Sequence, residues 1–365
     1  MNLWLVEPYY TGSHQAWADG YQAHSGHDVR LLTLPGRFWK WRMQGGAVTL
    51  ARLAAALDER PDLILASDML NVPVFLSLSG GLHDVPLAIY FHENQLTYPL
   101  QPGEKRDLHY GFINFVSALR ADAAFFNSAY HQAAFFDELP RLLKHFPDYT
   151  ELWTVDALRK KSQVLPLGLD LARFDTCRSE SPAADRPLLL WNHRWEYDKD
   201  PETFFRVVYA LDREGLDFGL IILGESFRNW PDEFLAARER LPERFVHFGY
   251  AEDFAAYAHW LWQADVVVST ALHEFFGAAV VEACYCDCLP VLPRRLAYPE
   301  LIPAQHHGTC LYDDFEGLLH RLRRAILRVE ETRAVSLRPE MACFDWRQMA
   351  PRYDRLLEEM VEAEG

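Results

Sequence analysis

The chain has 365 residues, of which 50% are hydrophobic and 24% charged, which predicts one large or two ordinary globular domains and excludes a disordered chain. Its 36 Lys and Arg residues face 52 Asp and Glu, a formal net charge of −16. A non-specific coat for nucleic acid is therefore excluded, and any RNA contact needs a local basic patch. Six cysteines are too few for a disulfide scaffold. Without a signal-peptide pattern or an apolar run of membrane-spanning length, the sequence predicts a cytoplasmic protein with no membrane segment.

Short apolar runs alternate with longer amphipathic segments along the whole chain. The predicted strands are 3–6, 29–32, 63–65, 87–90, 123–126, 163–165, 188–191, 219–223, 246–248, 266–268, 289–292 and 310–312. The predicted helical segments between them include 47–57, 108–119, 202–211 and 316–329. This alternation is typical of α/β folds in which helices cover both faces of a parallel sheet.

So many strands exceed what one sheet holds, so we predict two Rossmann-like domains facing each other across a cleft. The polar, proline-containing segment 177–187 has no periodicity and is the best linker. We therefore place the domains at 1–176 and 177–345. A C-terminal helix in 346–365 is expected to pack back on the first domain.

The most informative motif follows the predicted strand 266–268. A loop there contains Glu274, and a helix beginning near Gly277 carries Glu282, which gives the spacing E-x7-E. The backbone N–H groups of Phe276, Gly277 and Ala278 would begin that helix and form a cradle for an anion or a hydroxyl. One carboxylate can then bind sugar hydroxyls and the other a ribose. The alternative is a surface helix with two incidental acids.

A second cluster follows the strand 188–191, where Arg194 and Lys199 lie on the connecting turn. Two cations beyond the carboxyl end of a strand suit a diphosphate, although a solvated charged loop would look the same.

The chain has neither a G-x-G-x-x-G nor a P-loop motif, and no H-E-x-x-H. The alternating cysteines near Cys286 are read as buried thiols, so no metal site is predicted.

In the first half, Gly12 and Ser13 open the first predicted helix and offer backbone N–H groups to a phosphate, unless Ser13 is a plain helix cap. After the strand 87–90, the polar residues His92, Glu93 and Asn94 are expected to face the cleft.

Together these clusters resemble a known family. The segments GSHQAWADGY, FHENQLTYP, FNSAYH, WNHRWEYDKDP and FFGAAVVEACYCDC occur in consistent order. They resemble the tRNA-queuosine α-mannosyltransferases, which belong to the retaining GT-B glycosyltransferases of family 4. One departure is Asp287, where the resemblance leads us to expect Gly.

The resemblance implies transfer of mannose from GDP-mannose to queuosine at the wobble position of tRNA, without a further cofactor or a metal. It implies that Glu274 holds the donor sugar, that Glu282 binds the ribose, and that Arg194 and Lys199 neutralise the diphosphate. The remaining donor contacts come from Gly12, Ser13 and the segment Phe275, Phe276, Gly277 and Ala278. His92 would line the sugar near the reacting centre, and His14, Glu93 and Asn94 would lie on the acceptor side.

The functions that remain possible differ in the acceptor that they use. The segment 36–43 interleaves Arg37, Lys40 and Arg42 with Phe38, Trp39 and Trp41, so its cations can meet phosphates while its rings stack on bases. An aromatic-packed hinge is the alternative for this segment. A family 4 enzyme with a small-molecule, lipid or polysaccharide acceptor is the alternative function, and a non-catalytic nucleotide-sugar or RNA-binding module is a third. The sequence carries no expectation for the oligomeric state.

Overall fold

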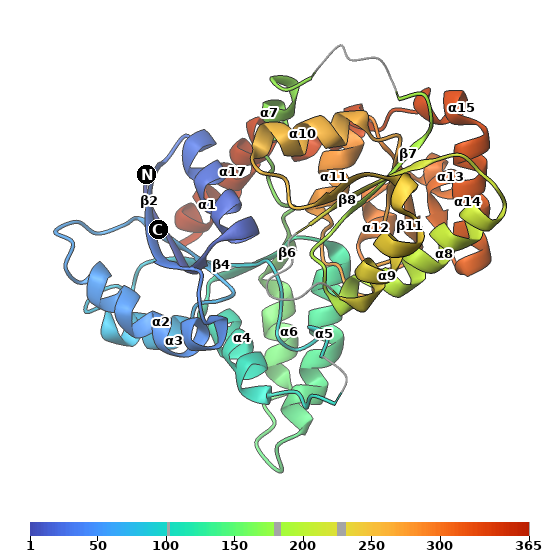
Figure 1. Cartoon of the computed structure of the whole chain (residues 1–365). Helices are drawn as coiled ribbons and strands as arrows, with labels where there is room; N and C mark the ends of the chain where they lie inside the picture. Colours follow the sequence, from blue (N-terminus) through green and yellow to red (C-terminus); the bar gives the residue numbers. More distant parts are fainter. Residues whose placement is uncertain (101–102, 179–183, 225–230, 365) are drawn as a thin grey trace. The chain divides into compact units, whose positions relative to one another are not determined.

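The computed structural model describes residues 1–100, 103–178, 184–224 and 231–364 (Figure 1). The chain divides into two compact units: unit 1 is Met1–Leu169 with Trp346–Gly365, and unit 2 is Asp170–Asp345. The division lies between Leu169 and Asp170 rather than after residue 176. Of the predicted linker 177–187, residues 179–183 lie outside the described residues. Among the helices that the structure describes, none is long and apolar enough to cross a membrane.

Unit 1 is built on a parallel sheet whose described strands follow the order β2-β1-β3-β4-β5-β6. The strands are β1 (Asn2–Tyr10), β2 (Asp28–Pro35), β3 (Leu63–Ser67), β4 (Leu87–Phe91), β5 (Ala123–Phe126) and β6 (Ser162–Val164). The helices are α1 (Gly12–His24), α2 (Trp39–Ala54), α3 (Val72–Leu78), α4 (Leu108–Arg120), α5 (Ala129–Lys144), α6 (Trp153–Lys160) and α17 (Trp346–Glu364).

Unit 2 repeats the architecture, with the described strands in the order β12-β11-β10-β7-β8-β9, all parallel. The strands are β7 (Leu188–Asn192), β8 (Gly219–Leu223), β9 (Phe245–Gly249), β10 (Val266–Val268), β11 (Leu289–Pro293) and β12 (Leu311–Tyr312). The main helices are α8 (Pro201–Arg213), α9 (Asp232–Arg240), α10 (Phe254–Gln263), α11 (Ala278–Tyr285) and α14 (Phe315–Leu327). The short ones are α7 (Ala172–Asp175), α12 (Tyr298–Leu301), α13 (His307–Cys310), α15 (Val329–Arg333) and α16 (Arg338–Met341).

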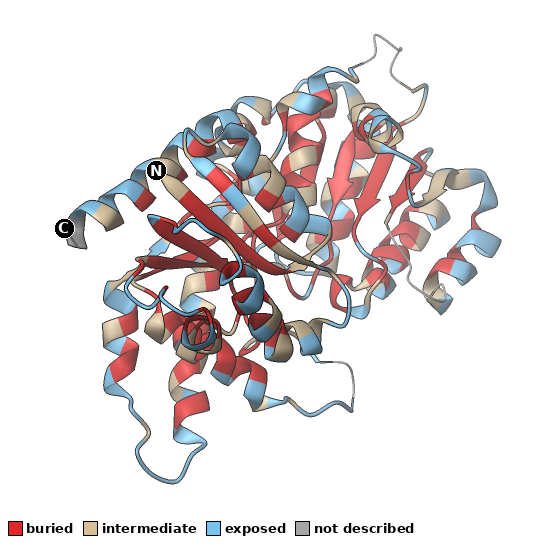
Figure 2. Cartoon of the chain, turned by 90° about the vertical axis from the view of Figure 1, so that its left-hand side faces the viewer, coloured by how far each residue is buried: buried red, intermediate tan, exposed pale blue. Residues whose placement is uncertain are grey.

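The central strands are apolar except for Ser67 and Asn192 at the ends of β3 and β7, because helices cover both of their faces. Every residue of β3, β4, β5, β7 and β8 is buried, and Figure 2 shows these strands in red. The strand order reverses between β1 and β3 in unit 1 and between β7 and β10 in unit 2. Loops leaving the carboxyl ends of strands at such a reversal form the usual ligand crevice of an open α/β sheet. The two-sheet α/β architecture confirms the predicted fold class.

The C-terminal helix α17 belongs to unit 1, where it packs beside α1 (Figure 1). A Cβ at Gly20 would lie 1.9 Å from the Trp346 indole nitrogen, and one at Gly168 would lie 2.3 Å from the same ring. Only glycine therefore lets the buried Trp346 ring approach both segments. Asp354 adds polar contacts by accepting hydrogen bonds from the hydroxyl groups of Tyr21 (2.8 Å) and Ser25 (2.6 Å).

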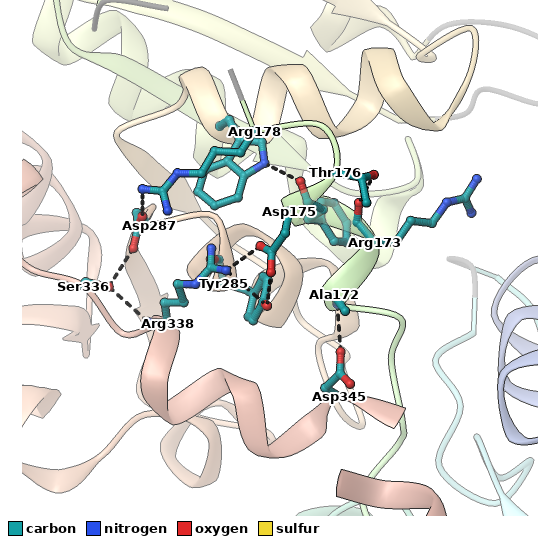
Figure 3. A network of polar contacts seen from close by, with 12 residues as sticks. Ala172, Arg173, Asp175, Thr176, Arg178, Tyr285, Asp287, Ser336, Arg338 and Asp345 are labelled. Carbon is teal, nitrogen blue, oxygen red and sulfur yellow. Dashed lines mark hydrogen bonds and ion pairs between the residues drawn. The ribbon is translucent and has the colours of Figure 1, made fainter. Parts of the chain in front are cut away.

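Asp287, where the resemblance led us to expect glycine, follows the end of α11. Its φ of +68° lies in the left-handed region, which glycine adopts at no steric cost. The aspartate offsets this strain with its carboxylate, which accepts a 2.6 Å hydrogen bond from Ser336 and pairs with Arg178 at 3.4 Å (Figure 3). The departure from glycine thus joins the turn after α11 to a polar network of unit 2.

Candidate functional site

In unit 2, the loops that leave β7 and β10 are tied together at the carboxyl edge of the sheet. The Thr270 hydroxyl donates to the backbone oxygens of Lys199 (2.8 Å) and Asp200 (2.9 Å), and the Leu272 N–H donates to the Asp198 carbonyl at 2.8 Å. Because these residues lie about seventy positions apart in the chain, the contacts fix one loop against the other. They bring Lys199 next to Glu274.

The Lys199 ammonium is the centre of this site. Its Nζ lies 2.8 Å from the His273 carbonyl oxygen, 3.2 Å from Asp198 Oδ2 and 3.3 Å from Glu274 Oε2. Burial by itself lowers the pKa of this lysine, but the carboxylates of Glu274 and Asp198 outweigh burial and raise it. Lys199 in turn holds the pKa of Glu274 below its usual value, although burial acts to raise it. Both groups are therefore charged at neutral pH.

Two histidines beside this ion pair are neutral. Burial, reinforced by the Lys199 charge, lowers the pKa of His193 and that of His273 to about 4. Arg194 has a half-exposed side chain that lies 3.6 Å from Glu196. The site thus presents one solvent-facing cation, Arg194, and one buried cation, Lys199. No role was predicted for His193 and Asp198, which lie in the segment WNHRWEYDKDP, or for His273, which directly precedes Glu274.

The start of α11 follows directly after Glu274. Gly277 has a φ of +97°, and a Cβ there would lie 3.1 Å from Leu301, so the turn requires glycine. The N-cap residue Gly277 has no side chain to cap this helix end, and the Phe276 N–H donates to Glu274 Oε1 at 3.4 Å. The rings of Phe275 and Phe276 are buried, and Phe275 packs edge-on against His273 with 4.3 Å between ring centroids. The backbone N–H groups of Gly277 and Ala278 can therefore face a ligand, whereas the two buried phenyl rings cannot.

Glu282 belongs to a separate hydrogen-bonded chain. Its Oε2 accepts a 2.6 Å hydrogen bond from the Tyr257 hydroxyl, which accepts a 2.7 Å bond from the Asn192 amide. Burial raises the pKa of Glu282 to about 7, while the Tyr257 hydrogen bond acts in the opposite direction. Sequence reasoning missed Tyr257 because it comes from α10, which carries no recognised motif.

In unit 1, a second polar cluster lies at the carboxyl ends of β1, β3 and β4. The His14 Nδ1 lies 2.9 Å from Glu7 Oε2, and the ring centroids of His14 and His92 are 4.3 Å apart. The backbone N–H of His92 donates to the Asp68 carboxylate at 2.9 Å, and the Trp17 ring packs edge-on against the His92 ring. Glu7 and Asp68 were not anticipated from the sequence.

The two histidines of this cluster carry different charges. Burial acts to lower the pKa of His14, but the Glu7 carboxylate outweighs it, and the pKa is raised to about 9. Burial and the neighbouring His14 charge push the pKa of His92 well below its usual value. His92 is therefore a neutral imidazole. Its two ring nitrogens find no hydrogen-bond partner among the described residues, so they can serve a ligand.

Glu7, His14 and His92 also form a grouping that could hold a metal ion. Each offers one ligand atom, and these atoms lie within 4.8 Å of one another. Imidazole and carboxylate are zinc ligands, but the Glu7–His14 contact is complete as an ion pair without a metal. The cysteines around Cys286 have buried side chains, and within the described ranges they belong to no metal grouping.

The other predicted residues of unit 1 differ in accessibility. Gly12 and Ser13 are exposed at the start of α1, whose cap is Thr11 rather than Ser13. Glu93 accepts a 2.9 Å hydrogen bond from Gln95. Asn94 is fully buried, and its oxygen accepts bonds from the Leu96 and Thr97 backbone N–H groups, so it orders its own turn.

The basic-aromatic segment 36–43 divides into exposed and packed rings. Phe38 and Trp41 are 79% and 61% exposed, whereas Trp39 packs against Tyr110 with 5.1 Å between ring centroids. Lys40 lies over the Trp39 ring. Arg42 donates to the Pro35 carbonyl at 3.0 Å. The two exposed rings and the neighbouring cations form an accessible surface, which we call the α2 patch: Arg37, Phe38, Lys40, Trp41 and Arg42.

The chain is similar to known proteins over nearly its whole length. Residues 2–169 match the family model described as tRNA-queuosine alpha-mannosyltransferase N-terminal, and residues 174–335 match glycosyl transferases group 1. The tRNA-queuosine alpha-mannosyltransferase of Drosophila melanogaster is 34% identical over 88% of this chain and 86% of its own length. A GDP-mannose-dependent alpha-(1-6)-phosphatidylinositol dimannoside mannosyltransferase of Mycobacterium tuberculosis is 26% identical over 88% and 80%.

Solved structures support the same fold. A sucrose-phosphate synthase from Thermosynechococcus elongatus superposes with a TM-score of 0.75 at 16% identity, covering all of both chains. The catalytic domain of starch synthase IV from Arabidopsis thaliana gives 0.71 at 13% identity, covering 99% of each. These likenesses identify the fold as GT-B.

The raised pKa of His14 predicts a pH-dependent stability. The folded-state value of about 9 exceeds the ordinary 6.5 of the unfolded chain, so the stabilisation is complete below pH 6.5 and is lost as pH rises through 9. The loss should approach roughly 3 kcal/mol, and thermal unfolding at pH 6 and pH 9.5 measures it. In Glu7→Gln this difference should largely disappear, because an amide cannot hold the imidazolium. An equal pH dependence in both proteins would contradict the ion pair.

Proposed function

The chain belongs to the tRNA-queuosine alpha-mannosyltransferase family and is a GT-B glycosyltransferase, and we propose that it moves mannose from GDP-mannose to queuosine in tRNA with retention of configuration. The observation that carries the donor side is the buried Lys199–Glu274 pair at the start of α11. This pair places a cation that can bind a phosphate in contact with a carboxylate that can bind sugar hydroxyls. An acceptor of this kind implies a cytoplasmic enzyme.

In the proposed donor site, cations bind the diphosphate and carboxylates bind the sugar and the ribose. Arg194 and Lys199 bind the diphosphate, because two cations offset the charge that develops when the sugar leaves. The backbone N–H groups at Gly277 and Ala278 add donors at a helix start. Glu274 accepts hydrogen bonds from the sugar hydroxyls, and Glu282 accepts them from the ribose.

The reaction proposed here needs no protein nucleophile. The bond between the mannose C1 and the phosphate oxygen breaks, and the acceptor hydroxyl forms the new bond on the same face of the sugar. The departing phosphate oxygen takes the hydroxyl proton. Catalysis then rests on charge stabilisation and positioning.

For unit 1 the proposal rests on the exposed backbone donors of Gly12 and Ser13 and on the buried ring of His92, whose nitrogens have no hydrogen-bond partner among the described residues. His92 is neutral with two available ring nitrogens, which suits a hydrogen bond to a sugar hydroxyl. Gly12 and Ser13 offer backbone N–H groups to a phosphate. His14 and Glu93 are assigned to the acceptor side, where His14 acts through the His92 ring. The burial of Asn94 limits its part to shaping the same loop.

A transfer assay tests this function. Purified protein is incubated with radiolabelled GDP-mannose, GDP-fucose or UDP-glucose, together with total tRNA that contains or lacks queuosine. We expect nuclease-sensitive label only with GDP-mannose and queuosine-containing tRNA, unchanged by EDTA. Label in a lipid or polysaccharide fraction instead would assign the chain to a different acceptor. Loss of activity with EDTA, restored by zinc, would show that a metal is needed and point to Glu7, His14 and His92.

Substitutions of the two acids of the E-x7-E motif should differ in their effects on turnover and on GDP affinity. Glu274→Gln should lower turnover by at least about 100-fold but leave GDP affinity within a few-fold, because its partner is the sugar. Glu282→Gln should weaken GDP binding by about 10-fold, since a carboxylate accepts from hydroxyls more strongly than an amide does. Protonation of Glu282 near pH 7 should also weaken GDP binding by wild type at pH 6, but not by Glu282→Gln. Equal losses of GDP affinity in both variants, by calorimetry, would contradict this division.

The α2 patch should bind the RNA. Each phosphate contact contributes about −0.7 to −0.9 to the slope of log affinity against log salt. The triple variant of Arg37, Lys40 and Arg42 to Ala should therefore reduce the slope by about 2 while GDP affinity stays unchanged. A matched control replaces three exposed arginines of unit 2, Arg213, Arg324 and Arg328. A slope altered only by the control would place the RNA contact on unit 2.

A further inference from the structure

The Lys199 ammonium has three N–H protons, and three acceptors surround it. The distances from Nζ are 2.8 Å to the His273 carbonyl, 3.2 Å to Asp198 and 3.3 Å to Glu274. Lys199 is only 7% exposed, so water reaches it poorly. Lys199 donates hydrogen bonds to His273 and Glu274, whereas its contact with Asp198 is an ion pair without a hydrogen bond. Because all three oxygens surround the nearly buried ammonium, a phosphate oxygen can approach Nζ only by displacing one of them.

The three acceptors differ in their freedom to move. The Asp198 side chain is 2% exposed and sits on the turn Tyr197–Lys199, whose backbone is bonded to Thr270 and Leu272. The His273 carbonyl is part of the backbone of the adjoining loop. Glu274 has a longer side chain that is 22% exposed and is the most distant of the three. Its Oε1 accepts a long 3.4 Å hydrogen bond from the Phe276 N–H, so Glu274 is held more loosely than the other two and is the acceptor that can turn away.

Charge leads to the same assignment. One ammonium between two carboxylates carries a net charge of −1, which repels a diphosphate as long as both acids stay. If Glu274 were its counter-ion by itself, the buried ammonium would depend on the diphosphate once Glu274 turned toward the sugar, and it would be unpaired whenever the diphosphate left before Glu274 returned; a buried lysine without a counter-ion loses its proton readily. A second, fixed carboxylate removes that difficulty.

We propose that Asp198 is a positioning residue that stays paired with Lys199 through the reaction cycle, whereas Glu274 exchanges between Lys199 and the donor sugar. The arriving diphosphate takes the place of Glu274 on the ammonium, and the released carboxylate becomes available to the sugar hydroxyls. Diphosphate and sugar are thereby recognised in one coupled step. This inference rests on the proposed donor binding by Lys199.

Asp198→Asn tests the proposal, because the amide keeps the shape of the side chain and removes its charge. The other titratable or charged groups that act on Lys199 are Glu274, Arg194, His193 and His273. Both histidines stay neutral above pH 6, and the loss of the Glu282 proton near pH 7 strengthens GDP binding in both proteins, so weaker binding above pH 7 reports the lysine. We expect Asp198→Asn to bind GDP at least about fivefold more weakly at pH 8.5 than at pH 7, as Lys199 loses its proton. Wild type should change less than about twofold over this range.

Two further variants distinguish charge support from simple damage to the turn. Asp200→Asn is the matched control, because Asp200 lies on the same turn but caps α8 through Thr203, a bond that asparagine preserves. Asp200→Asn should behave as wild type. Asp198→Asn combined with Lys199→Arg should lose the pH dependence, because a guanidinium does not deprotonate in this range. A flat pH profile in Asp198→Asn, or the same loss in Asp200→Asn, would overturn the proposal.

A stability measurement covers the case in which Asp198→Asn folds poorly. Lys199→Met leaves Asp198 buried without its cation, so adding Asp198→Asn to Lys199→Met should raise the melting temperature. A double variant that melts no higher than Lys199→Met would contradict the fixed pair. Failure of wild type to bind GDP at all would instead remove the proposed donor, and the inference with it.

Discussion

The ion pair between a buried lysine and two carboxylates organises unit 2. Lys199 and Asp198 come from the turn after β7, and Glu274 comes from the loop after β10, so the charge contacts join two chain segments that begin on neighbouring strands. A buried charge is costly unless it is paired and hydrogen-bonded, so the two loops must stay together for the lysine to remain an ammonium. The same contacts that stabilise the loops therefore bring together the groups that a sugar diphosphate needs.

Unit 1 also contains a buried ion pair beside a neutral imidazole. There the buried ion pair of Glu7 and His14 places a positive charge 4.3 Å from the neighbouring ring, which keeps His92 neutral. In each unit a buried charge therefore lies beside neutral imidazoles at the carboxyl edge of a parallel sheet. A neutral imidazole can donate from one nitrogen and accept at the other, which suits hydroxyl recognition better than a cation that can only donate.

Tertiary contacts explain two features of the sequence. One is the aspartate at position 287, and the other is the pair of glycines that face the ring of Trp346. The left-handed turn after α11 carries an aspartate because its carboxylate gains two partners that glycine would lack. Gly20 and Gly168 are far apart in the chain, but both are required by the single ring of Trp346. Neither relation is visible in a local pattern.

The sequence by itself determined the α/β class, the approximate strands, the loops that carry Arg194, Lys199 and Glu274, and the helix that carries Glu282. It could do so because apolar periodicity reports burial within one element, and functional loops follow the ends of buried strands. Only the tertiary structure decided that Asp198 supports Lys199, that Tyr257 supports Glu282, and that the units divide at Leu169. It also separated the exposed Trp41 from the packed Trp39. These properties depend on partners from distant parts of the chain, and the pKa of a side chain is set by those partners and by burial rather than by its neighbours in sequence.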